Sequence, residues 1–206
     1  VHKVAPAVGG AAVEGGVARR PIIDFAGYGQ TLRQRLDPSA GIFQALSERL
    51  RFEPRRVIFA HGRDERVQRA ALAYARAGFG TPLVIGREEI VRKGLETVGY
   101  APSEDPEIQI IDPETEPTIT ALADALYQRL QRRGYMPEDC ERMIRGNDVI
   151  LGASLLAHGR GDGLVAGATR KSAIVLRDAQ LVIDNRAGES AVGVSALVAK
   201  GRTVLV

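Results

Sequence analysis

Hydrophobic and polar positions follow two alternating patterns in the middle of the chain. Short, continuous apolar runs predict buried strands, at 57–60, 82–85 and 108–111. Each of the first two runs is followed by an amphipathic stretch that predicts a helix, from Asp64 to Ala77 and from Arg87 to Val98. This alternation is typical of parallel βαβ units with right-handed crossovers.

The pattern continues toward the end of the chain. Further helices are expected at Thr118 to Arg133, Pro137 to Arg145, Val149 to Ala157 and Lys171 to Ile183. Further strands are expected at Gly163 to Ala166, Ala191 to Ala199 and Thr203 to Val206. The sequence therefore predicts an α/β fold, a three-layer α/β/α arrangement around a mostly parallel sheet. Because the last strand is followed by no helix, we expect a truncated sheet whose edge is covered by a continuation or by self-association.

The first part of the chain has a different character. The residues from Val4 to Val13 are small and apolar, and leucines and isoleucines from Leu32 to Leu50 recur at helical spacing. The spacing is interrupted at Asp37-Pro38, where a proline disfavours helix in the residue before it. We interpret residues 1–52 as a linker with one or two amphipathic helices, and residues 53–206 as a separate domain.

Composition narrows the class of protein. Hydrophobic residues make up 45% of the chain and charged residues 26%, as in ordinary globular proteins. No apolar run approaches the roughly 20 residues that span a bilayer, and the start lacks the pattern of a signal peptide, so we expect no membrane contact. A single cysteine, Cys140, excludes an internal disulfide and suits a cytoplasmic protein. The net charge of +3 comes from arginines interspersed with acids, which argues against nucleic acid and leaves a small anionic ligand open.

The clearest candidate chemistry lies in the loop that follows the strand at 163–166. In open parallel sheets, ligands bind beyond the carboxyl ends of strands, where helix N-termini present free N–H groups. The loop offers a glycine, two hydroxyls and cations, a composition suited to binding phosphate. Its candidate binding residues are Gly167, Thr169, Arg170, Lys171, Ser172 and Arg177. A capped, solvated turn with ordinary surface cations is the alternative, and the loop at His61 to Arg63 is a second, weaker candidate.

Other groups carry less chemistry. The glycines from Gly159 to Gly163 precede a strand, so we interpret them as turns. His61 and His158 have no companions at metal-ligand spacing, and no metal site is predicted. Neither paired carboxylates nor a nucleophile and base can be assembled, and no catalytic residue is predicted.

Several segments resemble the phosphotransacetylase family. Arg55 to Ala71 resembles its first strand and helix, and Leu83 to Arg87 resembles its second strand and loop. Asp162 to Arg170, together with Leu176-Arg177, is similar to the segment that enters that family's acyl-phosphate and CoA cleft. The resemblance implies an isocitrate/isopropylmalate dehydrogenase-like fold.

Within this family, the chain looks most like the C-terminal domain of bacterial NADP-dependent malic enzymes. The similar segments are Leu32 to Pro38, Arg129 to Tyr135, Val192 to Ser195 and Gly201 to Val204. Ala5 to Val8 and Gly16 to Ile22 look like the end of the nucleotide-binding domain of those enzymes. The resemblance thus covers a junction of two domain types.

The chain also departs from the family pattern. His61 stands where a glutamate is usual, and Leu130 falls where a substrate-binding arginine is expected, with Arg129 one position away. Arg177 does match a substrate-binding arginine, and both Arg129 and Arg177 are kept as candidate binding residues. The resemblance implies that the catalytic residues of the transferase and of the malic enzyme lie outside residues 1–206.

The function implied by the resemblance is regulatory. Such a domain binds acetyl-CoA as an effector, assembles the subunits into a homo-oligomer and performs no acetyl transfer. NADP and a divalent metal ion belong to the malic enzyme part. Two alternatives stay open: an active phosphate acetyltransferase, and an assembly scaffold with an empty cleft.

Overall fold

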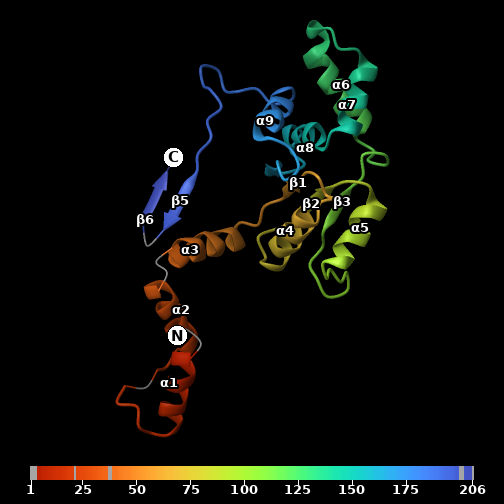
Figure 1. Ribbon diagram of the computed structural model, residues 1–206. Helices are drawn as coiled ribbons and strands as arrows, with labels where there is room; N and C mark the ends of the chain where they lie inside the picture. Colours follow the sequence, from red (N-terminus) through yellow and green to blue (C-terminus); the bar gives the residue numbers. More distant parts are fainter. Residues whose placement is uncertain (1–3, 21, 37–38, 200–201, 206) are drawn as a thin grey trace. The chain divides into compact units, whose positions relative to one another are not determined.

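The computed structural model of the protein describes residues 4–20, 22–36, 39–199 and 202–205. The chain forms two compact units (Figure 1). One unit is Leu50–Ala191, and the other consists of Val1–Arg49 and Val192–Val206. The predicted boundary after residue 52 stays a prediction.

The unit Leu50–Ala191 is built on a four-stranded parallel sheet with the order β3-β2-β1-β4. Its strands are β1 (Val57–Phe59), β2 (Pro82–Ile85), β3 (Gln109–Ile111) and β4 (Gly163–Val165). Ile58 on the central strand lies opposite Leu83 of β2 and Leu164 of β4. The chain thus runs outward from β1 through β2 to β3 and returns to the other side of β1 as β4. Four predicted strands and their parallel pairing are confirmed.

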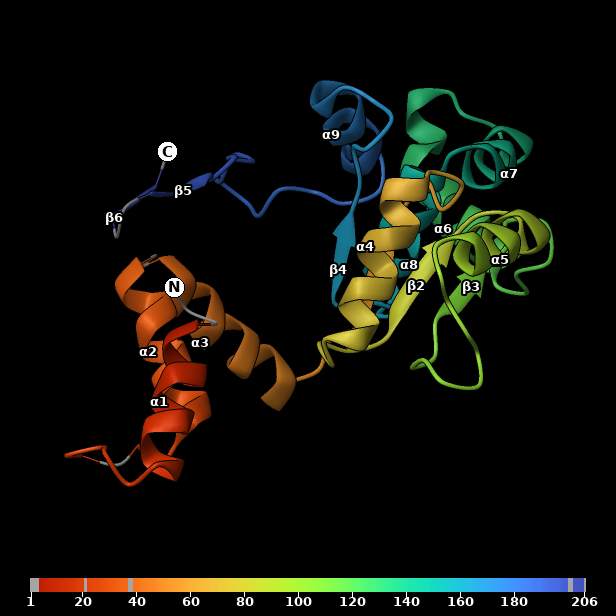
Figure 2. The ribbon, with the colours of Figure 1, turned by 60° about the horizontal axis from the view of Figure 1, so that its bottom comes forward.

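Helices cover both faces of this sheet (Figure 2). On one face lie α4 (Glu65–Arg76) and α5 (Glu88–Thr97), and on the other lie α6 (Ile119–Leu130), α7 (Pro137–Gly146) and α8 (Asp148–Ala157). Side chains of successive strand residues point to opposite faces. Val84 accordingly packs with α4 and α5, whereas Leu83 and Ile85 pack with the helices of the other face. The predicted three-layer α/β/α fold is confirmed.

The segment after α6 differs slightly from the prediction. The expected helix over Thr118 to Arg133 divides into α6 and a short 3-10 turn, Gln131–Arg133. Gly134 follows with a φ of 85°, a left-handed conformation that ends the helix. The helix expected from Lys171 to Ile183 is α9 (Ser172–Gln180), shorter at both ends.

The last two strands correct the prediction of a continuing parallel sheet. β5 (Ala196–Ala199) and β6 (Arg202–Leu205) pair antiparallel with each other in a separate two-stranded sheet. Residues 191–195, expected in a strand, have no regular structure. A connection this short between the two strands allows only antiparallel pairing, because a parallel pair needs a long crossover.

The other unit contains helices at its N-terminal side. They are α1 (Val4–Glu14), α2 (Phe25–Leu36) and α3 (Ser39–Phe52). The end of α3, from Leu50 onward, belongs to the unit Leu50–Ala191. One or two amphipathic helices were expected in this region, and the structure has two, α2 and α3. The interruption expected at residues 37–38 lies outside the described residues. Helix α1 was not predicted, because its small apolar residues carry no clear periodicity. Across the part of the chain that the structure describes, no helix is both long and apolar enough to cross a membrane.

Candidate functional site

A cavity of about 300 Å³ lies where the loops after β1 and β4 meet. Its wall is formed by His61, Arg63, Asp64, Gly146, Asp148, Thr169 and Arg170. The loops that form it follow the carboxyl ends of the parallel strands β1 and β4. From β1 the chain continues to β2 and β3 on one side, whereas β4 lies on the other side, so the direction of the strand order reverses between β1 and β4. Such reversal points are where open α/β sheets bind ligands.

The loop after β1 is fixed by close packing of its backbone. Gly62 donates its N–H to the carbonyl of Ile85, at 2.8 Å, and a Cβ at this glycine would lie 2.6 Å from the same oxygen. The buried side chain of Gln68 donates to the carbonyl of Gly62 at 2.7 Å. The loop therefore holds its neighbours, His61 and Arg63, in defined positions at the cavity.

His61 has an unusual conformation and environment. Its φ is 64°, the left-handed region that non-glycine residues rarely adopt, and its backbone N–H donates to a carboxylate oxygen of Asp148 at 3.1 Å. Both ring nitrogens are buried and have no hydrogen-bond partner among the described residues. Burial lowers the pKa of the imidazole, and the nearby positive charge of Arg170 acts in the same direction, while Asp148 and Asp64 oppose the shift.

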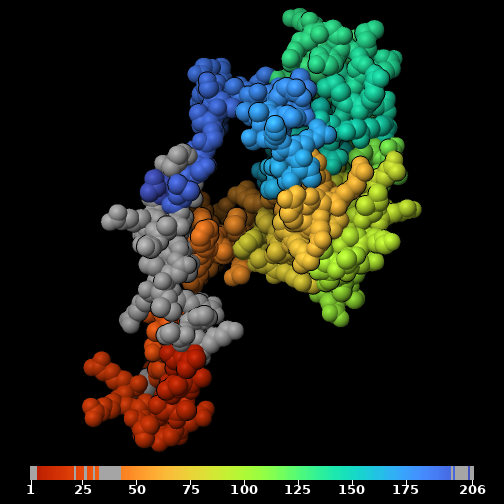
Figure 3. Space-filling model, in the orientation of Figure 1, coloured from red at the N-terminus to blue at the C-terminus, as the bar shows by residue number. Residues whose placement is uncertain are grey.

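An arginine ties the two loops together. The Arg66 guanidinium donates to the carbonyl of Ala168 at 2.8 Å and to both carboxylate oxygens of Asp64. The hydrogen bonds from Arg66 to the Asp64 carboxylate lower the pKa of that carboxyl to about 2. Figure 3 shows the surface of α9 and its preceding loop, in light blue, adjoining that of α4, in gold. The cavity thus has one continuous rim formed by two distant parts of the sequence.

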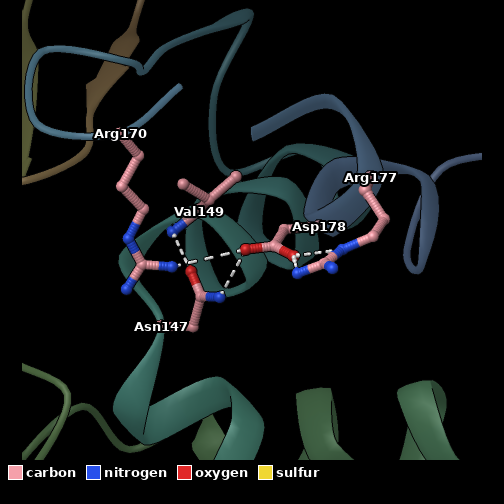
Figure 4. A network of polar contacts seen from close by, with 5 residues as sticks. All are labelled: Asn147, Val149, Arg170, Arg177 and Asp178. Carbon is pink, nitrogen blue, oxygen red and sulfur yellow. Dashed lines mark hydrogen bonds and ion pairs between the residues drawn. The ribbon is translucent and has the colours of Figure 1, made fainter. Parts of the chain in front are cut away.

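The loop after β4 is held from behind by a buried carboxylate. Asp178 of α9 is 4% exposed and accepts a hydrogen bond from the side-chain amide of Asn147 at 2.8 Å. Arg170 and Arg177 approach the same carboxylate at 3.4 Å and 3.2 Å (Figure 4). The oxygen of Asn147 meanwhile accepts from the N–H of Val149 and caps α8. One asparagine and one aspartate therefore connect α8, α9 and the loop.

The structure brings some of the predicted site residues together at the cavity. Thr169 and Arg170 line it, and Gly167, with a φ of 110°, provides the left-handed turn that the loop needs after β4. Lys171 and Ser172 are exposed at the start of α9 and do not line the cavity. Their side chains face the solvent at the start of α9, which agrees with the alternative interpretation of this loop as a solvated turn.

The remaining two predicted residues lie outside the cavity wall. Arg177 is 73% exposed and pairs with Asp178. Arg129 donates to the carbonyl of Leu181 at 2.8 Å and forms an ion pair with Asp184, so it anchors the segment after α9. Leu130, where the resemblance expects an arginine, is fully buried in the hydrophobic core.

Sequence reasoning missed part of the site. The loop at His61 to Arg63 was predicted only as a second, weaker candidate, and Gly146, Asn147 and Asp148 were assigned no role. The signal that could have found them is the sequence Asn147-Asp148 after Gly146, because asparagine and aspartate are typical of a helix N-terminus, where anions are favoured. The position of that N-terminus next to His61 depends on tertiary packing.

Two other features bear on the site. A larger hollow of about 600 Å³ lies between α7 and α8 and shares Gly146 with the cavity, but none of the predicted site residues lines it. Of the glycines predicted to be turns, Gly159 lies in one, with a φ of 72°, whereas Gly163 is the first residue of β4. Gly161 is required by close packing, because a Cβ there would lie 2.7 Å from the Ile58 side chain. Among the described residues, no group of three or more histidine, cysteine or acidic side chains could hold a metal ion.

Comparison with known proteins gives this fold and site a context. The family described as phosphate acetyl/butaryl transferase matches residues 41–206. Over all 206 residues, the chain is 41% identical to an NADP-dependent malic enzyme of Rhizobium meliloti, of which it covers 27%. It is also 27% identical, over 73% of its length, to a phosphate acetyltransferase of Staphylococcus aureus, of which it covers 44%.

Solved structures agree with these sequence matches. A phosphotransacetylase from Streptococcus pyogenes superposes with a TM-score of 0.66 at 30% identity, covering 76% of this chain and 45% of that protein. The chain spans only about a quarter of the malic enzyme, 27% of its length, and less than half of the transferases.

Proposed function

This chain belongs to the phosphate acetyl/butaryl transferase family, and from that membership we propose that it is a regulatory domain that binds acetyl-CoA within a longer NADP-dependent malic enzyme. In this proposal, the domain carries out no acetyl transfer itself. The longer protein oxidises and decarboxylates malate to pyruvate with NADP and a divalent metal ion, in a part of the protein other than this chain.

The observation that carries the proposal is the cavity at the strand reversal, with a hydroxyl and two guanidinium groups in its wall. Thr169, Arg170 and Arg63 supply hydrogen-bond donors of the kind that bind phosphoryl groups. The N-terminal ends of α4 and α8 also reach the cavity, through Asp64 and Asp148. Helix N-termini favour anions because their free N–H groups carry partial positive charge.

The size of the cavity indicates which part of acetyl-CoA it takes. At about 300 Å³, it lies at the lower end of the range of roughly 300–1,000 Å³ for cavities that enclose drug-sized ligands. We therefore assign to it a phosphoryl end of the effector rather than the whole molecule. The hollow of about 600 Å³ that shares Gly146 provides room for an extended remainder.

The arginines next to the cavity are available to a ligand. Arg170 is 39% exposed, and its contact with Asp178, at 3.4 Å, is longer than that between Asp178 and Asn147, at 2.8 Å. The carboxylate is thus anchored mainly by the asparagine. Arg170 can turn toward a phosphoryl group without leaving a buried charge unpaired, because Arg177, at 3.2 Å, stays paired with the Asp178 carboxylate.

Regulation requires the effector to prefer one of two arrangements of the longer protein. In the proposal, acetyl-CoA draws the loops after β1 and β4 onto its phosphoryl group, and the malic enzyme part is less active in that arrangement. The coupling is reciprocal, so malate and NADP should weaken the binding of acetyl-CoA to the same extent that it weakens theirs.

The domain is also proposed to assemble subunits into a homo-oligomer. Apolar residues on and after α9 are exposed, among them Leu176 at 48%, with Ile174 and Ile183 both at 37%. Exposed apolar groups that lie close together often mark sites of protein contact. Light scattering of the full-length protein should therefore give a mass that is a multiple of one subunit, and a monomer at micromolar concentration would contradict this part of the proposal.

Calorimetric titration of the full-length protein with acetyl-CoA tests the proposal. The unchanged protein should bind, and Arg170→Gln should bind about tenfold more weakly or worse, since it loses a charge-assisted hydrogen bond. Arg92→Gln is the matched control, because Arg92 is also an exposed arginine that pairs with an acid, Glu88, but lies on α5, away from the cavity wall. Absence of binding in the unchanged protein, or equal binding by Arg170→Gln, would contradict the proposal.

An active transferase is the second candidate, favoured by the relatives from Staphylococcus and Streptococcus that bear that name. An assay for acetyl-CoA formation from acetyl phosphate and CoA separates the two. We expect no formation by the full-length protein above a control without protein. Formation that disappears in Arg170→Gln would support the transferase instead.

A further inference from the structure

His61 is placed at the cavity by an arrangement that costs free energy. Its backbone is left-handed, and both of its ring nitrogens are buried without a hydrogen-bond partner among the described residues. A buried polar atom without a partner is unfavourable, and residues kept in such a state cluster at functional sites. The side chain forms part of the cavity wall, so a ligand inside the cavity lies beside the imidazole.

The charges in the cavity wall are balanced without the histidine. Arg63 and Arg170 contribute two positive charges, and Asp64 and Asp148 contribute two negative charges. The Asp64 carboxylate is already paired with Arg66, and Asp148 accepts the N–H of His61. Because Arg66 compensates Asp64 from outside the wall, one net positive charge is left, and a dianionic ligand needs one more. The imidazole is the group in this wall that can gain a positive charge near neutral pH.

We propose that His61 binds the phosphoryl group of a phosphate monoester or a similar tetrahedral dianion, and that its imidazole becomes protonated when the anion binds. This role of His61 rests on the proposed function in one respect only, which is that acetyl-CoA is the ligand that carries the phosphoryl group. The anion lies between His61 on the β1 side and Thr169 and Arg170 on the β4 side. Binding therefore takes up a proton, which comes from the solvent.

This proton uptake fixes the sign of the pH dependence. Burial keeps the pKa of His61 below its ordinary value, and the charge of Arg170 adds to that effect, while Asp148 and Asp64 oppose it. A bound dianion stabilises the imidazolium and raises that pKa. By linkage, the anion binds more tightly as the pH falls through this range.

Inorganic sulfate is the probe that isolates the histidine, because sulfate itself does not titrate near neutral pH. The first measurement is an NMR titration of the imidazole resonances of the full-length protein with sulfate. The pKa of His61 should rise. The resonances of His158, whose ring contacts the carbonyl of Ser154 on α8, serve as the internal reference. An unchanged pKa of His61 at saturating sulfate would overturn the inference.

Two variants then test the role of the imidazole. Asparagine tolerates a left-handed backbone, so His61→Asn should keep the loop, and His61→Gly removes the side chain at no conformational cost. Both should bind sulfate roughly tenfold more weakly at about pH 6 and lose the pH dependence. His158→Gln is the control and should behave like the unchanged protein. If sulfate binding by both His61 variants still depended on pH, the inference would be contradicted.

Competition with acetyl-CoA separates this inference from the proposed function. If acetyl-CoA displaces sulfate from His61, both are supported. If sulfate raises the pKa of His61 and acetyl-CoA does not displace it, the anion site stands and the effector proposal fails. If acetyl-CoA binds with no effect on His61, the effector proposal stands and the inference fails.

Discussion

At the scale of single residues, glycine at position 62 determines the shape of the candidate site. Its backbone lies against β2, and a Cβ would meet both the carbonyl oxygen of Ile85 and the side chain of Val84 at 2.5–2.6 Å. These neighbours belong to the centre of the sheet and cannot move without disturbing the core. The loop that carries His61 therefore depends on this glycine.

Gly62→Ala should destabilise the protein by about 1–3 kcal/mol, because overpacking beside a β-strand shifts the backbone. Gly163→Ala is the matched control: it also lies at an end of a parallel strand, but a Cβ there meets nothing within 4 Å. Urea denaturation of both variants checks the difference. Equal midpoints for Gly62→Ala and the unchanged protein would show that the loop is not held as described.

Individual site residues were predictable only where a local pattern marks them. The loop from Gly167 to Arg170 combines a glycine, a hydroxyl and a cation after a recognisable strand, and the structure places Thr169 and Arg170 at the cavity. His61 and Asp148 are 87 positions apart, and no local rule relates them. Arg177 was predicted from the composition of the loop and from resemblance; its guanidinium contacts the buried Asp178, and it does not line the cavity.

At the scale of elements, Asn147 joins three of them. Its oxygen caps α8 through the N–H of Val149, and its amide donates to the buried Asp178 of α9. Asp178 in turn faces Arg170 in the loop after β4. The position of that loop thus depends on one side chain at the junction of α7 and α8.

Asn147→Ala should lower the free energy of unfolding by about 2 kcal/mol, from the lost cap and from the lost donor to a buried carboxylate. Asn147→Ser keeps a capping oxygen but not the amide donor, and should recover about half of that loss. Thermal or urea denaturation gives both values. Equal losses in the two variants would mean that the cap contributes nothing, and no loss in either would contradict the described junction.

The elements themselves were largely predictable, with exceptions that have physical reasons. Buried parallel strands and amphipathic helices have strong periodic signals, so β1 to β4 and α4 to α8 follow the sequence closely. β5 and β6 were placed in the wrong kind of sheet, since apolar runs do not reveal their pairing partner. Helix α1 was missed because its residues are apolar all round and none is buried.

At the scale of the whole molecule, stability should depend on pH at its acidic end. Arg66 and Arg76 lower the pKa of Asp64 and Asp105 from 3.8 to about 2. A carboxyl whose pKa is depressed by folding stabilises the fold above its ordinary pKa, and that contribution is lost as the pH falls toward the lowered value.

The urea midpoint should therefore fall between about pH 4 and about pH 2, and Asp105→Asn should reduce that fall, because it removes one of the two groups. Asp124→Asn is a control, since Asp124 lies on α6 and no ion pair involving it is found among the described residues. A midpoint that does not change over this range, or an equal fall in Asp105→Asn, would contradict the described pairing with Arg76.

We propose above all that the phosphoryl end of acetyl-CoA binds at the carboxyl edge of the parallel sheet, between β1 and β4. A crystal structure of the full-length protein with acetyl-CoA tests it most directly. We expect a phosphoryl group in contact with His61, Thr169 and Arg170, with the rest of the ligand extending over Gly146. Acetyl-CoA bound elsewhere, with this cavity unchanged and unoccupied, would contradict it.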